Sequence, residues 1–391
     1  MKHWVRQVAA AMSVWALCWT TGCAGFFVYP GTATGGTGST ANDYVYVANS
    51  TTQTLAGFSV GTATLTAVTN SPYALTFIPT AVAVNPADTM VFVAGSNGLT
   101  GFINAYSIGT GGALTLLMSN NVAAAGEVSI DVSPDGNWLL GLDSNGPSLN
   151  EAIVDVYEIN TGTGQLSLGT AGGYTYTGSS IPVIVPKAIK FAPNGDYVFA
   201  AVGTAGDLVF PFTTTVSNGA PLGTALALNF GTSSSVSDNA LAVNSNSSYL
   251  YIARSGTSGG LAVYAIGSGG SLTPVTGSPF AAGTNPISVA VNTTATLAYV
   301  ANQSDNTISA YSLGSSGTVT SAAIFTATTT AAARAIAVDK SGDYLLAAAN
   351  GGYPDLAMYS YDSTTSGKLD FSTSIPTGTD PTNPVALAVT H

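Results

Sequence analysis

One strand-like motif recurs along the whole chain and limits the fold more than any other feature of the sequence. It is a run of aromatic, aliphatic and small residues that occurs seven times: YVYVAN (44–49), VFVAG (91–95), WLLGLD (138–143), YVFAAVG (197–203), YLYIAR (249–254), AYVAN (298–302) and YLLAAAN (344–350). Successive copies start 46 to 59 residues apart, so seven units of about 50 residues fill the chain. A sheet repeat of this length is typical of one four-stranded blade of a β-propeller.

Each unit also contains the other strands that such a blade needs. The second strand carries an aromatic residue at a fixed place: Phe58, Tyr106, Tyr157, Phe210, Tyr264, Tyr311 and Tyr359. A weaker Leu/Thr strand follows. The last strand is short and alternating: TAVAVN (80–85), VSIDVS (128–133), KAIKFA (187–192), NALAVN (239–244), ISVAVN (287–292), RAIAVD (334–339) and VALAVT (385–390). Its alternation of small and branched residues suits a strand beside the narrow central channel.

The order of strands within the units is permuted. The first unit lacks the alternating strand, whereas residues 385–390 supply one after the seventh unit. We therefore expect the C-terminal strand to pair into the N-terminal blade and close the ring, which removes an exposed sheet edge. The prediction is an all-β fold, a monomeric seven-bladed β-propeller of four-stranded blades over residues 43–391.

Residues 1–23 have the form of an export signal, with a basic start, an apolar run and small residues at the end. Their Gly-Cys ending resembles a bacterial lipobox, which implies lipidation of Cys23, attachment to a membrane and a position at the cell envelope, on the periplasmic face or the cell surface. Thr20 departs from that motif, and ordinary cleavage after Ala24 is the alternative. Residues 24–42 are rich in Gly and Thr and are interpreted as a flexible tether.

Composition excludes several classes of function. Only 7% of the residues are charged and the net charge is −11, so the clustered Lys and Arg of a nucleic-acid interface are missing. A hydrophobic fraction of 46% excludes a disordered acidic chain. Both cysteines, Cys18 and Cys23, fall within the export signal, so thiol chemistry and Cys-bound metal are excluded from the domain. We see no cofactor motif and expect no cofactor and no metal.

One segment carries a family resemblance. The run GSPFAAGTNPISVAVNTTATLAYVANQSDNTISAYSL (277–313) resembles the YVTN-type bacterial propeller repeat. It is also similar to the propeller lactonases, the family of bacterial 6-phosphogluconolactonase. The resemblance extends over all seven units and implies a propeller fold. It implies lactonase activity less strongly, because propellers host unrelated functions.

Charged residues mark one face of the predicted channel. We expect the alternating strand to start, and the YVAN-type strand to end, on this face. Most units carry Pro, small or amide residues at these two places; the charged exceptions are Glu127, Asp143, Lys187, Asp238, Arg254 and Arg334. The candidate ligand-binding residues are Asp143, Lys187, Arg254, Arg334, Asn49, Asn302 and Asn350. An Arg beside a carboxylate can grip an anionic or carbonyl ligand. The alternative is that these charges pair with one another only because they are buried.

The same face supplies the candidate catalytic residues. Lactone hydrolysis needs a base that activates water and a group that stabilises the oxyanion. Glu127 or Asp238 is the candidate base, and Lys187 or Arg334 the candidate oxyanion group. Propeller lactonases typically carry His at the start of the alternating strand, and this sequence has no His in any blade.

Three functional hypotheses follow. The preferred one is a binding module at the cell envelope, with a protein, a glycan or a small molecule as its ligand. A lactonase-like hydrolase that acts on a sugar lactone at the channel face is the alternative. A structural or adhesive surface protein is the third.

Overall fold

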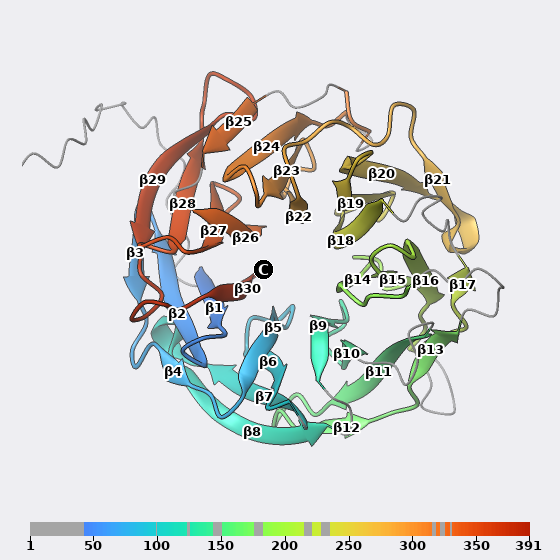
Figure 1. The fold of residues 1–391 in the computed structure, drawn as a ribbon. Helices are drawn as coiled ribbons and strands as arrows, with labels where there is room; N and C mark the ends of the chain where they lie inside the picture. Colours follow the sequence, from blue (N-terminus) through green and yellow to red (C-terminus); the bar gives the residue numbers. More distant parts are fainter. Residues whose placement is uncertain are drawn as a thin grey trace, which may run out of the picture. The chain divides into compact units, whose positions relative to one another are not determined.

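A computed structural model of the chain places its strands in a ring of seven sheets (Figure 1). The residues that it describes are 43–98, 100–122, 126–143, 151–175, 183–214, 221–227, 235–314, 318–320, 325–328 and 331–391. The predicted export signal, the lipidation at Cys23 and the tether lie outside these residues. Within them, no helix has the length and apolar character needed to cross a membrane.

Each sheet is one blade, and its innermost strand faces the centre of the ring. Blades 1 to 3 comprise β30 (Pro384–Val389), β1 (Tyr44–Asn49), β2 (Thr54–Gly61), β3 (Thr64–Ala67) and β4 (Tyr73–Ala74); β5 (Ile78–Val84), β6 (Met90–Ser96), β7 (Gly101–Ile108) and β8 (Leu114–Val122); and β9 (Glu127–Val132), β10 (Trp138–Asp143), β11 (Glu151–Ile159), β12 (Leu166–Leu168) and β13 (Gly172–Thr175).

Blades 4 to 7 follow in the same order from the centre outward. They comprise β14 (Ala188–Phe191), β15 (Tyr197–Ala201), β16 (Asp207–Pro211) and β17 (Leu226–Ala227); β18 (Val236–Val243), β19 (Tyr249–Gly256), β20 (Gly260–Ile266) and β21 (Leu272–Pro274); β22 (Pro286–Val291), β23 (Leu297–Asn302), β24 (Thr307–Ser312) and β25 (Phe325–Thr328); and β26 (Ala332–Val338), β27 (Tyr344–Asn350), β28 (Leu356–Tyr361) and β29 (Leu369–Ile375).

A polar side chain at the end of the inner strand stabilises the turn that follows it. In blade 2, Asn85 Oδ1 accepts hydrogen bonds from the backbone N–H groups of Thr89 and Met90, at 2.9 and 2.8 Å. The equivalent acceptors in four other blades are Ser133, Asn244, Asn292 and Asp339. Short polar side chains favour such turns because they replace a backbone acceptor. This explains the Asn, Ser or Asp that ends the repeated alternating motif.

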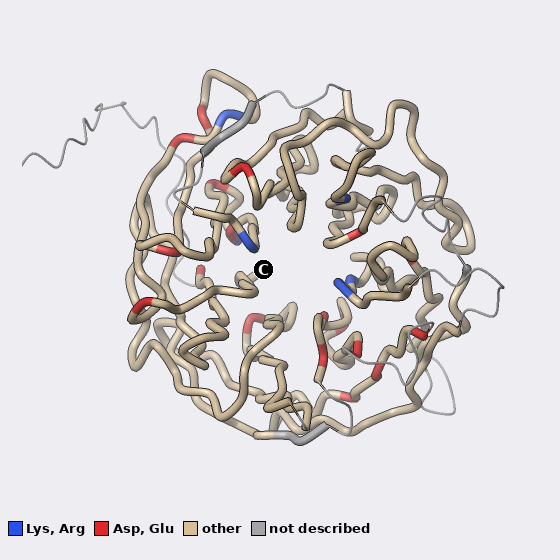
Figure 2. The backbone as a smooth tube through the Cα atoms, in the orientation of Figure 1, with Lys and Arg blue, Asp and Glu red and all other residues tan. Residues whose placement is uncertain are grey.

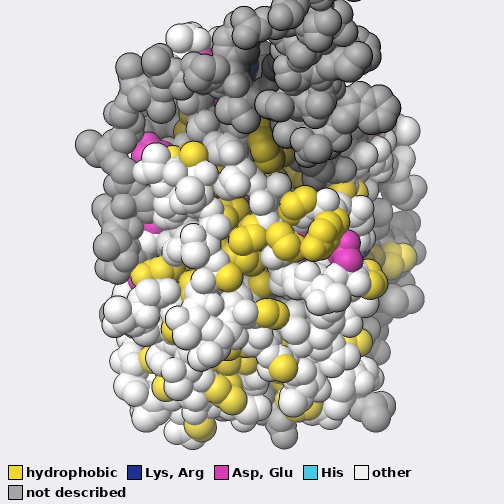
Figure 3. All heavy atoms as spheres, turned by 90° about the vertical axis from the view of Figure 1, so that its left-hand side faces the viewer, with side chains coloured by type: hydrophobic (Ala, Val, Ile, Leu, Met, Phe, Trp, Pro, Cys, Tyr) yellow, Lys and Arg dark blue, Asp and Glu magenta, His cyan; other side chains and the backbone are white. Residues whose placement is uncertain are grey.

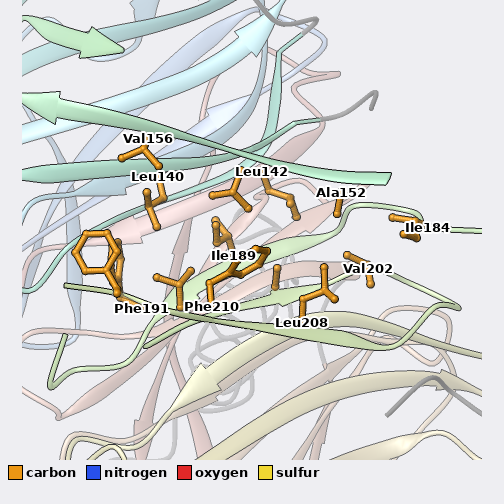
Figure 4. Close-up of a cluster of buried hydrophobic side chains, with 14 of the residues drawn as sticks. Leu140, Leu142, Ala152, Val156, Ile184, Ile189, Phe191, Val202, Leu208 and Phe210 are labelled. Atoms are coloured by element: carbon orange, nitrogen blue, oxygen red, sulfur yellow. The ribbon is translucent and has the colours of Figure 1, made fainter. Parts of the chain in front are cut away.

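Hydrophobic side chains between neighbouring blades form the core. The seven repeated aromatic residues of the second motif are all buried. Between blades 3 and 4, side chains of β10 and β11, such as Leu140 and Val156, pack against Ile189 and Phe210 of blade 4 (Figure 4). Burial of each such side chain contributes about 1.5–3 kcal/mol. Because every blade is covered on both faces, its middle strands are apolar without strict alternation.

The C-terminal strand closes the ring, as predicted. β30 pairs antiparallel with β1, in a register that runs from Val45↔Val389 to Asn49↔Pro384. Beyond the strand, the backbone N–H of Tyr44 donates to Thr390 Oγ1 at 2.9 Å, and the N–H of Thr390 donates to the Tyr44 carbonyl at 3.0 Å. Blade 1 therefore takes its inner strand from one end of the propeller sequence and its outer strands from the other.

Two blades differ from the predicted four strands. In blade 1, β3 and β4 both pair with β2, and in blade 3, β12 and β13 both pair with β11. In each case the two short strands pair with different ends of the same neighbour. The outermost strand of these blades is thus split in two by a bend, and no further layer is added.

The outer wall of the ring is poor in charge. The described part of the side shown in Figure 3 is covered mainly by backbone and uncharged side chains, with hydrophobic side chains between them. Large hydrophobic residues on outer strands, such as Leu116, Leu168 and Phe371, are about half exposed. The low charged fraction of the sequence therefore appears directly on this surface.

A pair of carboxyl groups beside the closing strand makes the stability of the ring depend on pH. Asp43, directly before β1, is buried close to Asp339 at the end of β26, and the backbone N–H of Ser341 donates to Asp43 Oδ2 at 3.3 Å. Burial and the negative charge of Asp339 raise the pKa of Asp43 from 3.8 to about 7. The folded state then keeps a proton that the unfolded chain loses near pH 4, so the free energy of unfolding falls as the pH rises from about 4 to about 7.

We expect an Asp43→Asn variant to lose part of this pH dependence, because the amide cannot ionise. One fully shifted proton changes the free energy of unfolding by about 1.4 kcal/mol per pH unit. Urea unfolding across this pH range measures the slope for both proteins. The control is Glu158→Gln, at an exposed position on β11, which should keep the slope of the original protein. If the free energy of unfolding of Asp43→Asn falls with pH as steeply as that of the unchanged chain, Asp43 is not the group that causes the pH dependence.

Candidate active site

A register shift of the kind that a β-bulge produces lies at the start of the inner strand in six of the seven blades; in blade 4, Lys187 directly precedes β14 and the register has no shift. In blade 2 the register moves from Pro79↔Gly95 to Ala81↔Ala94, which leaves Thr80 as an extra residue. A bulge changes the direction in which its extra side chain points. The residues at this place, one per blade, are Val385, Thr80, Val128, Lys187, Asn239, Ile287 and Arg334. We call these seven residues the mouth ring.

The mouth ring opens onto the central cavity, which has a volume of about 560 Å³. Of the seven residues, five line this cavity directly: Thr80, Val128, Lys187, Asn239 and Val385. Below them the wall consists mainly of the alternating small and branched residues of all seven inner strands. The cavity is large enough for a small organic molecule.

Hydrogen bonds between blades hold the mouth ring in place. The hydroxyl of Thr80 donates to the carbonyl of Glu127 in the next blade, and Asn239 Nδ2 donates to the carbonyl of Pro286 at 2.8 Å. Ser129 and Ser288 accept similar bonds from the following blade, each at 3.1 Å. Side chains on such a wall keep their positions when a ligand binds, which lowers the entropic cost of binding.

Lys187 and Arg334, both in the mouth ring, are the two basic residues for which no hydrogen-bond or acidic partner exists among the described residues. The other four each lie within 2.5–2.9 Å of a carboxylate: Lys190 at Asp131, Arg254 at Asp238, Lys340 at Asp88 and Lys368 at Asp362. Arg334 Nε is buried without an acceptor, whereas Lys187 is exposed and lines the cavity. A buried donor without a partner costs about 1–3 kcal/mol. An oxygen atom of a ligand would satisfy it.

Glu127 lies in blade 3, next to the blade that carries Thr80, but its side chain does not face the cavity. Its side chain is fully buried, and the hydroxyl of Tyr157 donates to Oε1 at 3.1 Å. Burial, followed by the negative charge of Asp155, raises the pKa of Glu127 well above its ordinary value. Because its side chain is buried and hydrogen-bonded to Tyr157, Glu127 is unsuited to act as a base on a molecule in the channel. Asp143, its register partner on β10, is buried as well.

Asp238 and Arg254 pair with each other inside blade 5. Arg254 Nε and Nη2 donate to the two carboxylate oxygens of Asp238 at 2.5 and 2.7 Å. Nη2 also donates to the hydroxyl of Tyr264 at 3.2 Å and lies 3.8 Å from Asp207. Burial and the charge of Asp238 raise the pKa of Asp207 well above its ordinary value. Asp238 and Arg254 thus follow the alternative stated in the sequence analysis, in which buried charges pair with each other.

The three candidate asparagines end the second strands. Asn49 Nδ2 donates to the carbonyl of Thr377 at 3.2 Å, and Asn302 Nδ2 donates to Ser309 and Thr307 at 2.9 and 3.0 Å. Both asparagines are fully buried, whereas Asn350 is partly exposed at the end of β27. Asn49 and Asn302 therefore hold neighbouring strand ends together. No group of three or more His, Cys, Asp or Glu residues in the described part of the chain is arranged to hold a metal.

The bulge separates the sequence candidates into two groups. The residue before the bulge pairs with a residue at or near the end of the second strand, as in Glu127↔Asp143 and Asp238↔Arg254. These four residues are buried or nearly so. The bulged residue itself belongs to the mouth ring. Thr80 and Asn239 were not predicted as site residues. Their alignment with Lys187 and Arg334 in the repeated motif was the signal that could have identified them.

A sequence comparison and a structural comparison agree on the type of propeller. Residues 224–329 match the family model described as "Lactonase, 7-bladed beta-propeller". No curated protein matches the chain. Because the family match covers about a quarter of the chain, the remaining support comes from the fold.

Solved structures share this fold at low sequence identity. A Bacteroides uniformis protein assigned as a 6-phosphogluconolactonase is 17% identical and has a TM-score of 0.72 over 90% of this chain and 100% of its own. The periplasmic gluconolactonase of Pseudomonas aeruginosa is 16% identical, with a TM-score of 0.66 over 89% and 99%. Hydrazine synthase of Kuenenia stuttgartiensis is 12% identical, with a TM-score of 0.60 over 82% and 92%. The chain is thus a seven-bladed β-propeller that is similar to the lactonase family in the sequence of residues 224–329 and in its fold.

Proposed function

We propose that the protein is a lactonase-type hydrolase that acts on a sugar lactone at the mouth ring. The observation that carries the proposal is the position of Lys187 and Arg334, two cations without partners among the described residues, at the start of their inner strands, with Lys187 in the wall of the cavity. The lactonase family match and the shared fold with gluconolactonase structures support the choice of substrate.

The chemistry follows from the charge that develops during lactone opening. Hydroxide or water adds to the carbonyl carbon, and the carbonyl oxygen becomes an oxyanion. The ring C–O bond then breaks, and the departing alkoxide takes a proton from water to give a hydroxy acid. Lys187 or Arg334 would stabilise the oxyanion, and donors placed in advance are the largest single source of such catalysis.

The buried carboxyl groups determine the pH dependence of this mechanism. Glu127 is buried and hydrogen-bonded to Tyr157, and Asp238 is paired with Arg254, so neither one is available as a base at the mouth ring. Solvent hydroxide must then supply the nucleophile. We expect the rate of hydrolysis to rise steadily with pH, without the acidic inflection that a catalytic carboxylate or His produces.

The experiment measures initial rates of opening for a panel of sugar lactones, with Arg334→Met and Lys187→Met beside the original chain. Loss of an oxyanion donor typically lowers kcat by about 10²–10³-fold, and we expect a loss of this order for at least one of the two variants. Lys368→Met, on an exposed hairpin of blade 7, is the matched control and should retain full activity. Absence of turnover above buffer, or equal rates in all four proteins, would overturn the proposal.

Binding without turnover is the second candidate function. It is favoured by the lack of an accessible carboxylate in the mouth ring, because the two cations would hold a sugar acid equally well without a base. A protein that binds hydroxy acids at the mouth ring and opens no lactone would establish this role.

A further inference from the structure

One level of the central cavity wall is charged in two neighbouring blades and apolar in the other five. At this level, below the mouth ring, the inner strand of each blade pairs with the third residue of the second strand. Five blades carry alanine here: Ala83, Ala242, Ala290, Ala337 and Ala388. Blades 3 and 4 carry Asp131 and Lys190 instead, paired with Leu140 and Phe199. All seven residues line the cavity.

Asp131 and Lys190 form an ion pair that a molecule in the cavity can contact. Lys190 Nζ lies 2.9 Å from Asp131 Oδ1, and the two side chains are 44% and 14% exposed. Figure 2 shows basic residues at the inner edge of blade 4 and acidic residues on the inner strand of blade 3 beside it. Asp131 Oδ2 also accepts a hydrogen bond from the backbone N–H of Phe191 at 2.8 Å. An ammonium group has three N–H donors and a carboxylate about four acceptor positions, so both groups can bond to a ligand as well.

The ring itself does not require charge at this level. Ser129 and Ser288 accept the same kind of hydrogen bond from the backbone of the following blade with a neutral hydroxyl, each at 3.1 Å. The five alanine blades pack without an ion pair. A partly exposed ion pair contributes only about 0–1 kcal/mol to stability. Its donors and acceptors in the cavity wall are therefore better explained by contact with a ligand.

The ion pair lies deeper in the same wall as Lys187. Lys187 precedes Lys190 by three residues, which corresponds to about 10 Å along an extended strand. Both lysines line the cavity in blade 4. A ligand with its carbonyl group at Lys187 can therefore extend its other end along blade 4 to Lys190 and Asp131. Lys340, beyond the end of β26, is held by Asp88 at 2.5 Å.

The ion pair has no net charge, and this decides which group it suits. A hydroxyl group accepts a hydrogen bond from the ammonium group and donates one to the carboxylate. A phosphate monoester carries about −1.5 to −2 charges at neutral pH. It would meet Asp131 as a like charge, while Lys190 is already neutralised. The pair therefore favours a hydroxyl group over a phosphate group.

We infer that Lys190 and Asp131 form a specificity subsite, which binds the hydroxyl group at the end of a sugar lactone opposite its carbonyl and disfavours a phosphate group there. This inference rests on the proposed function, which places the carbonyl at the mouth ring. It names the substrate class as the lactone of an unphosphorylated sugar acid. The open sugar acid keeps the same terminal hydroxyl and binds to the same subsite.

The test measures equilibrium binding by calorimetry, so it needs no turnover. The probes are a six-carbon sugar acid, its derivative without the terminal hydroxyl, and its derivative with a terminal phosphate. We expect the sugar acid to bind about tenfold more tightly than either derivative, because hydrogen bonds to charged groups are lost in one and like charges meet in the other.

Two variants distinguish ligand contact from a structural role. Lys190→Met should remove the difference between the sugar acid and its deoxy derivative. Asp131→Asn keeps an acceptor for the Phe191 N–H but releases the ammonium group of Lys190 from its counter-charge. We expect this variant to bind the phosphorylated acid at least as tightly as the unphosphorylated acid, which reverses the original order. Lys368→Met is the control and should keep that order.

The outcomes separate the inference from the proposed function. Equal affinities for the three acids, no binding of any of them, or an unchanged order in both variants would overturn the inference. Turnover of sugar lactones without a preference for the terminal hydroxyl would contradict the inference alone. A hydroxyl preference that depends on Lys190 and Asp131, without turnover of any lactone, would contradict hydrolysis and leave the subsite standing.

Discussion

A chain that ends at residue 383 is expected not to form a stable ring. Without β30, the backbone groups of β1 lose their partners, although all six residues of this strand are buried in the complete fold. Leu387 and Val389 also leave the hydrophobic cluster that contains Val45 and Val47. Several side chains at about 1.5–3 kcal/mol each approach the whole stability of a domain, about 5–15 kcal/mol. We expect Tm to fall by more than about 10 °C, measured by circular dichroism.

The matched control for this truncation ends at residue 390. It removes His391 alone, whose backbone N–H donates to Asp88 Oδ1 at 2.7 Å at the surface, and it keeps the whole of β30. We expect the free energy of unfolding to change by less than about 1 kcal/mol, as for the loss of an ordinary exposed contact. If the two truncated chains melt at the same temperature as the full chain, the ring does not depend on its closing strand.

Replacement of Arg254 by Met is expected to cause the largest loss among point substitutions. Asp238 and Asp207 would remain buried without the cation that now lies 2.5 and 3.8 Å from them. Removing one partner of a buried ion pair costs about 3–5 kcal/mol. Urea unfolding at neutral pH measures the loss. The loss should be smaller in mild acid, because the stranded carboxylates can then take up protons.

Two further variants show whether charge is the cause. Lys368→Met removes an exposed cation that contacts Asp362 and Asp370, and should cost less than about 1 kcal/mol. Adding Asp207→Asn and Asp238→Asn to Arg254→Met should recover much of the stability, because no buried charge is left. Failure of this combined variant to recover would show that Arg254 acts through its packing.

The architecture was predictable because the same strand pattern occurs in seven units, so an unclear strand in one unit is identified from the others. The split outer strands of blades 1 and 3 could not be recognised in single units, yet seven similar units define the blade length and the number of blades. The missing inner strand of the first unit and the additional one at 385–390 predicted the closure that β30 and β1 make. The alternating motif at residues 385–390 thus indicated, from the sequence alone, that this segment forms the inner strand of blade 1.

The site was predictable only in part, since a shift of one residue decides which side chains reach the channel. Lys187 and Arg334 were identified as candidates from their aligned positions, and both belong to the mouth ring. Asp238 lies one residue before a bulge and Arg254 opposite it, so both point into blade 5. No pattern of residue types in the strand distinguishes the bulged position from its neighbour before the pairing is known.

The sequence by itself therefore determined the seven blades, their closure and the scarcity of charge. These follow from periodic burial, which every unit repeats. The tertiary structure alone decided which charges neutralise each other and which stay free, because ion pairing depends on distances between strands that are far apart in the sequence. Lys187 and Arg334 are 147 positions apart in the numbering, and only the ring places them at equivalent positions, at the starts of the inner strands of blades 4 and 7.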